Sequence, residues 1–225
     1  FMNWAHQKME EEFGTMKRQK RPMMHCGLRY SREGAGGMKM DQDEFCQKLQ
    51  PGRLDPHRRN LDDDPCTPAE KTLLRSLLGG LLWLCQTRLD LLADTVLAQT
   101  HIESPQIKHI KAANATNTRA KRYAQNCGLH YPKLQFPVHL AQVADASHAT
   151  KDTSYPREGG LVLLKEDRHI PTDANGEISD GNAYLLGGSC HVLCAVSHKA
   201  KRVSPSTSRA ETNACCYLKE IGQMI

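Results

Sequence analysis

The chain has 225 residues and a mass of 25.2 kDa, which is enough for one sizeable hydrophobic core or two small ones. Lysine and arginine outnumber aspartate and glutamate by 30 to 25, a balance that suits a polyanionic partner and an ordinary surface equally well. Nine irregularly spaced cysteines and the lack of a signal-like N-terminus indicate reduced thiols in an intracellular protein. The sequence has no apolar run of the roughly 20 residues that a membrane-spanning helix needs.

The first part of the chain mixes helical and strand patterns. We predict a helix within residues 1–20, a β-hairpin formed by residues 25–30 and 38–40, and a short helix at residues 43–49. From Pro51 to Cys66 the chain is rich in proline, arginine and aspartate without periodicity, so we expect a linker there. The chain starts without Met and stops just after a helical pattern, so we expect a fragment of a longer protein.

The clearest boundary is Thr67-Pro68-Ala69-Glu70, which combines an N-cap hydroxyl, a proline at the first helical position and a glutamate three residues after the cap. Leucines at helical spacing follow this start, and Gly79-Gly80 would let another backbone approach the helix closely. Two more helices are predicted, one over residues 89–100 and one from a cap at Ser104-Pro105 to about residue 125.

After Gly128 the helical periods give way to short runs of β type. We predict strands at residues 138–144, 160–164, 183–186 and 191–197, with Gly187-Gly188 as a hairpin turn. A final helix is predicted over residues 207–221, capped by Ser206 or Thr207. Helices followed by antiparallel strands and one more helix define an α+β fold.

Two carboxylates stand at positions suited to metal chemistry. Asp145 follows a mostly apolar strand, and Glu211 falls near the start of the last helix. An acid from a strand end and an acid from a following helix can approach across one edge of a sheet and share Mg²⁺ ions, which suits phosphodiester hydrolysis. The alternatives are an exposed aspartate that opens a turn and a glutamate that complements the helix dipole.

Several segments then resemble, in order, the copia-type retrotransposon polyprotein. Gly27 to Gln42 is similar to the thumb hairpin of its reverse transcriptase and the glutamine that follows it. Arg75 to Leu84 and Thr87-Arg88-Leu89-Asp90 are similar to its Ser-Leu-x-Gly helix and its Thr-Arg-Pro-Asp motif, with Leu89 in place of proline. Asp145 to Ala149, Tyr184 to Gly188 and Ser206 to Glu211 are similar to its Asp-Ala-Asp-Trp-Ala, hairpin and Ser-x-x-Glu-Ala-Glu segments, with Ser147 and His148 departing from the pattern.

The resemblance implies three regions: a reverse transcriptase thumb-like segment at residues 1–60, a helical connection segment at residues 61–130, and an incomplete ribonuclease H-like domain at residues 131–225. Asp145 and Glu211 would then be the first two metal-binding acids of a site that cuts the RNA strand of an RNA–DNA hybrid with Mg²⁺ or Mn²⁺. The later acids and the polymerase aspartates would lie outside this chain. We therefore expect a fragment that is inactive alone and works with the rest of the polyprotein.

A basic cluster lies before the last helix, where the family has a lysine-rich segment. Its members that could contact the phosphates of a nucleic acid are His198, Lys199, Lys201 and Arg202. A solvated charged turn is the alternative. A second function from another class is a non-enzymatic, retroelement-derived module that binds nucleic acid or a protein through this loop and its leucine-rich helices.

Cysteine and histidine also suggest a zinc site at Cys190-His191 and Cys194, which we rank below core cysteines. A tetrahedral site needs four ligands, and on a regular strand Cys190 and Cys194 would share a face while His191 points away. Cys215 and Cys216 are expected to pack against the core from the last helix.

Overall fold

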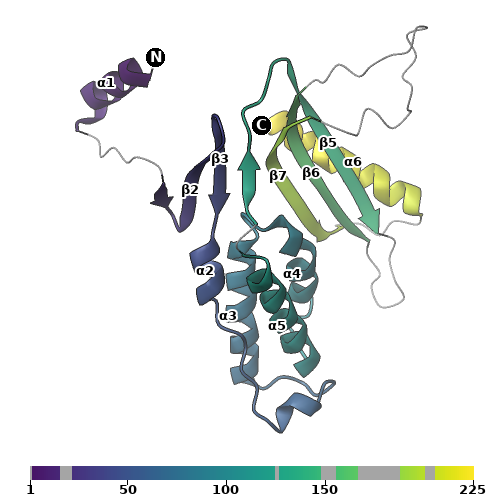
Figure 1. Ribbon diagram of the computed structural model, residues 1–225. Coiled ribbons are helices and arrows are strands. Elements are labelled where there is room, and N and C mark those ends of the chain that lie inside the picture. The colour runs from purple at the N-terminus through teal and green to yellow at the C-terminus, as the bar shows by residue number, and fades with distance from the viewer. Residues whose placement is uncertain (1, 16–21, 125–126, 148–155, 167–187, 201–205) are drawn as a thin grey trace.

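The computed structural model describes residues 2–15, 22–124, 127–147, 156–166, 188–200 and 206–225. It confirms a mixed helix and sheet architecture with two antiparallel sheets, as expected for an α+β protein (Figure 1). A layer of helices lies below the two sheets (Figure 1). The chain runs from the first sheet into these helices and then on to the second sheet. No helix among the described residues is long and apolar enough to cross a membrane.

The first sheet has the strand order β1-β2-β3-β4, with bounds Met23–His25, Leu28–Glu33, Gly37–Asp41 and Leu129–Tyr131. Helix α1 (Met2–Phe13) precedes it and α2 (Asp43–Lys48) follows β3. The single strand predicted over residues 25–30 is split by a tight turn, because Cys26 and Gly27 both have positive φ angles, +48° and +76°. Two such residues form the hairpin turn that matches the twist of paired strands.

Helix α3 (Pro68–Leu84) begins as predicted. Thr67 is its N-cap, its hydroxyl accepts the backbone N–H of Glu70, and the Glu70 carboxylate accepts the backbone N–H of Thr67 in return. Arg58 also donates to both Glu70 oxygens, at 3.0 Å each. These hydrogen bonds lower the pKa of Glu70 to about 2, and those from Arg58 have the largest effect.

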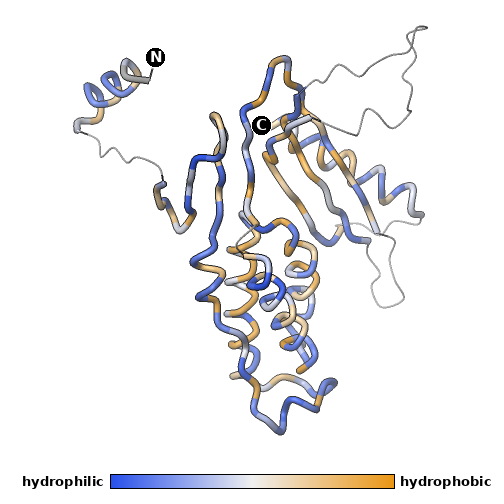
Figure 2. The backbone as a smooth tube through the Cα atoms, in the orientation of Figure 1, coloured by the Kyte–Doolittle hydropathy of each residue, from blue (hydrophilic) through white to orange (hydrophobic). Residues whose placement is uncertain are grey.

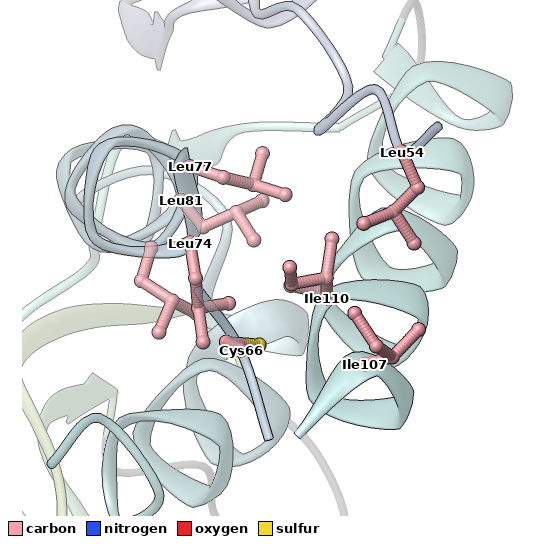
Figure 3. Close-up of a cluster of buried hydrophobic side chains, with 9 residues drawn as sticks. Leu54, Cys66, Leu74, Leu77, Leu81, Ile107 and Ile110 are labelled. Carbon is pink, nitrogen blue, oxygen red and sulfur yellow. The ribbon is translucent and has the colours of Figure 1, made fainter. Parts of the chain in front are cut away.

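The helical layer holds the main hydrophobic core. The cluster consists of Leu54, Cys66, Leu74, Leu77, Leu78, Leu81, Ile107, Ile110 and Ala113, most of which are labelled in Figure 3. Figure 2 shows the apolar residues concentrated in α3 and in the second sheet, whereas the loop below α3 is hydrophilic. The leucine spacing of α3 thus produces one continuous apolar stripe that faces the next helices.

Two expectations about this layer were wrong. The segment from Pro51 to Cys66 is not a bare linker, because Leu54 and Cys66 are buried in the core and Arg58 bonds Asp64 and Glu70. Within the described part of the chain, no backbone approaches α3 at its glycine pair. Instead, a Cβ on Gly80 would lie 2.5 Å from Leu49 Cδ1, so the glycine makes room for a side chain.

Helix α4 (Leu92–Gln99) follows a short 3₁₀ turn at Leu89–Leu91, and α5 spans Ile107–Arg122. The cap of α5 is Gln106 rather than Ser104-Pro105. The backbone N–H of His109 donates to the Gln106 carbonyl at 3.0 Å, and the Nδ1 of His109 accepts the Gln106 backbone N–H at 2.9 Å. His109 therefore satisfies an N–H group that would otherwise be left without a partner at the helix start.

This cap makes stability depend on pH. Burial, the positive charge of His101 and that of Lys108 lower the pKa of His109 below its ordinary value near 6.5. The neutral ring therefore contributes stability above pH 6.5, and this contribution is lost as the pH falls through the lowered pKa. We expect the free energy of unfolding in urea to fall more between about pH 7.5 and 5 in the wild type than in His109→Asn, whose amide oxygen caps without titrating.

The control is His57→Asn, which replaces an exposed histidine. Its free energy of unfolding should depend on pH as that of the wild type does. Parallel curves for wild type and His109→Asn would contradict the titrating cap.

The second sheet has the order β5-β6-β7, with bounds Val138–Ser147, Arg157–Glu166 and Cys190–Lys199. Helix α6 (Thr207–Met224) follows it and lies across one face (Figure 1). Ser206 is the cap, as one of the two predicted candidates, because its hydroxyl accepts the Arg209 backbone N–H. The strand predicted at 183–186 and the Gly187 position of its turn lie outside the described residues.

Candidate functional site

The face of β5 that carries Asp145 is fixed by its neighbours. The strand is longer than predicted, and Asp145 lies inside it, paired with Gly159 of β6. Ala144 and Ala146, on either side of Asp145, pack against α6. Because successive side chains of a strand point to opposite faces, Asp145 projects from the face that α6 does not cover.

Glu211 lies on the other side of this sheet. Ala210, Ala214 and Leu218 repeat every four residues along α6 and are buried against the strands. Glu211 follows Ala210 directly and is exposed. The two predicted acids are therefore not brought together: the backbone of the sheet separates the Asp145 carboxylate from the helix that carries Glu211.

This arrangement does not fit a shared Mg²⁺ or Mn²⁺ ion. A two-metal site needs oxygen ligands that converge within bonding distance of the same ion. The part of the chain that the structure describes contains no group of three or more histidine, cysteine, aspartate or glutamate side chains that could hold a metal. The hydrolytic step assigned to Asp145 and Glu211 therefore stays a prediction.

His198 of the predicted basic cluster faces α6 rather than solvent. Its Nε2 lies 3.0 Å from Glu158 Oε2, and Glu158 is buried. The imidazole ring also packs on Tyr217 of α6, with ring centroids 4.6 Å apart. Sequence reasoning missed both partners, because the register of β6 and β7 places Glu158 beside His198 and the packing of α6 places Tyr217 against it.

A groove of about 540 Å³ runs beside this residue, between the helical layer and the second sheet. It is lined by Leu82, Leu92, Val96, Gln99 and Thr100 on the helical side and by Ala195, Val196, Ser197, His198, Lys199 and Tyr217 on the sheet side. Lys199 is exposed at the end of β7. Lys201 and Arg202, predicted for the same role, lie outside the described residues.

The predicted geometry of the cysteine and histidine cluster is wrong. Val162 of β6 pairs with Cys194, but Leu163 pairs with Val192, so Leu193 is an extra residue in β7. Such a bulge reverses the alternation of faces. Cys190 and Cys194 therefore point to opposite faces, and His191 shares the face of Cys194.

The two cysteines of the last helix also differ from the prediction. Cys215 and Cys216 are exposed on α6 and do not pack in the core.

Residues of the Thr87-Arg88-Leu89-Asp90 segment, together with Gln42, make buried polar contacts between elements of the fold. The hydroxyl of Thr87 donates to Gln42 Oε1 at 2.9 Å. Arg88, only 3% exposed, donates to both carboxylate oxygens of Asp90 and to the carbonyl of Ala120, each at 2.8 Å. These contacts link the end of α3 to the segment after β3 and to α5.

Comparisons of the chain with protein-family models, with curated protein sequences and with solved structures give no match.

Proposed function

We propose that the chain is a copia-like retroelement fragment, similar to a reverse transcriptase end joined to half of a ribonuclease H domain, that binds an RNA–DNA hybrid without cutting it. The observation that carries the proposal is the groove beside β7. Lys199 supplies a cation there, Tyr217 supplies an aromatic ring, and Gln99, Thr100 and Ser197 supply hydrogen-bonding groups. Such a combination suits the phosphates and sugars of a nucleic acid backbone.

The order of elements supports the retroelement origin. Three antiparallel strands, followed by a helix that covers one face, occupy the region that the resemblance assigns to the nuclease. The separation of Asp145 from Glu211 supports a binding role over hydrolysis in this chain. The whole parent polyprotein would supply any cutting activity.

A protein partner bound through the leucine-rich helix is less favoured. Leu74, Leu77, Leu78, Leu81 and Leu84 of α3 are all buried within the fold. They cannot contact a second protein unless the helical layer opens, which would expose the main core.

Salt-dependent binding tests the proposal. We expect Lys199→Gln to weaken binding of a fluorescently labelled RNA–DNA hybrid several-fold and to make the slope of log affinity against log salt less negative by about one. The physical reason is the loss of one cation that displaces counterions from phosphates. The measurement is fluorescence anisotropy of the full chain at four salt concentrations, with double-stranded DNA of the same length as a second ligand.

Lys48→Gln is the matched control, because Lys48 is an exposed lysine on α2. It should leave both the affinity and the slope unchanged. Equal losses in the two variants, or no binding of the hybrid at low salt, would overturn the binding role.

A cleavage assay separates binding from catalysis. With Mg²⁺ or Mn²⁺ we expect the wild type and Asp145→Asn to leave the hybrid intact to the same degree, because the described strands place no second acidic side chain on the face that carries Asp145. Cutting that disappears in Asp145→Asn would restore the nuclease hypothesis.

A further inference from the structure

A second groove, of about 520 Å³, lies between α4 and α5, on a different surface from the groove beside β7. Its lining residues are Asp94, Leu97, Ala98, His101, His109, Ala112, Ala115, Thr116 and Arg119. Cross-helix contacts close both ends. His101 stacks on His109 at one end, with ring centroids 4.2 Å apart, and Arg119 pairs with Asp94 at the other.

The walls of the groove between these two ends are mostly apolar. Leu97 and Ala98 line the α4 side, while Ala112 and Ala115 line the α5 side with methyl groups only. The end residues His109 and Arg119 are ten positions apart on one helix, a span of about 15 Å. A slot of this volume, mostly apolar with a few polar groups at its ends, has the character of a small-molecule site.

The histidine end has a defined chemistry. His109 Nδ1 accepts the backbone N–H of Gln106, so the neutral ring carries its proton on Nε2, the atom further from the backbone. The rings of His101 and His109 are nearly parallel, with an interplanar angle of 6°. Each imidazole lone pair lies in the plane of its own ring, so the lone pairs of two parallel stacked rings do not converge on one metal ion.

This end therefore offers an N–H donor and a flat ring surface rather than metal ligands. Lys108 pairs with Asp63 and Arg119 pairs with Asp94, so the polar group that this end offers to a ligand is the Nε2–H donor of His109. An anionic acceptor is favoured there over a cation.

We propose that the groove between α4 and α5 binds a small, flat aromatic carboxylate, with its ring system against Leu97 and the alanines and its carboxylate at the His109 end. Burial of the ring system against the apolar walls stabilises the complex, and the Nε2–H of His109 donates to the carboxylate. This site is independent of hybrid binding, because the two grooves use different sides of α4.

The test uses 2-naphthoate as the probe and the full chain labelled with ¹⁵N. We expect saturable amide shifts confined to α4 and α5, with affinity at least about tenfold weaker for 2-naphthylmethylammonium, which has the same rings and a cationic donor. Ala112→Trp should fill the slot and weaken naphthoate binding at least about tenfold. Ala93→Trp, at an exposed α4 alanine outside the lining, should not change it.

Ala115→Trp, also exposed, provides the same test if Ala112→Trp does not give the spectrum of a folded protein. Equal binding of the two probes, unchanged binding in both slot variants, or non-saturable shifts spread over the whole chain would each overturn the proposal. Hybrid binding is measured separately, so the failure of one site is distinguishable from the failure of the other.

Discussion

Arg88→Ala is expected to lower the free energy of unfolding by about 3 kcal/mol. The substitution removes three hydrogen bonds, two to Asp90 and one to the Ala120 carbonyl. Asp90 is half exposed, so water can solvate its carboxylate once Arg88 is gone. The Arg88 side chain is buried, so its removal leaves a cavity. Urea unfolding followed by circular dichroism at pH 7.5 measures the loss.

Arg75→Ala is the matched control, because Arg75 lies on the exposed side of α3. Its effect should stay within about 0.5 kcal/mol of the wild type. A loss for Arg88→Ala no larger than that of Arg75→Ala would show that the hydrogen bonds of Arg88 to Asp90 and Ala120 do not stabilise the helical layer.

Gly160→Val is expected to loosen α6 from the second sheet, at a cost of about 3 kcal/mol. A Cβ on Gly160 would lie 2.1 Å from Leu218 Cδ1 and 2.5 Å from the backbone oxygen of Val143. The leucine can rotate, but the strand oxygen can move only with β5. Hydrogen exchange of the α6 amides measures the effect, and we expect their protection to fall more than that of α3.

Gly159→Val is the control, since a Cβ on Gly159 would meet only the Val196 oxygen, at an ordinary 3.6 Å. It points to the other face and should leave α6 protected. If the two variants expose α6 to the same degree, the helix is not held by contact with Gly160.

The local elements could largely be predicted from the sequence, because their signals are local. Thr67 and Glu70 predict the start of α3, and Ser206 predicts the start of α6. The α5 cap was missed, since Gln106 and His109 form a capping box from residue types that rarely do so. The Cys26-Gly27 turn was missed because cysteine seldom adopts a positive φ.

The candidate site could be predicted much less well. A motif places Asp145 near the end of a strand but does not say which face it occupies, and that depends on the packing of Ala144 and Ala146. The bulge at Leu193 likewise depends on how β7 pairs with β6. Contacts of His198 with Glu158 and Tyr217 join residues far apart in sequence, so no spacing rule indicates them.

The face that Asp145 occupies depends on its place in the alternation of side chains along β5. One residue added or removed within β5 would exchange inward and outward positions along the rest of the strand, and Asp145 would then face α6. The same step would turn Ala144 and Ala146 outward and place a carboxylate against the alanine side of the helix. A single codon insertion or deletion in β5 would therefore change the face of the sheet that Asp145 occupies, with no acidic residue changed.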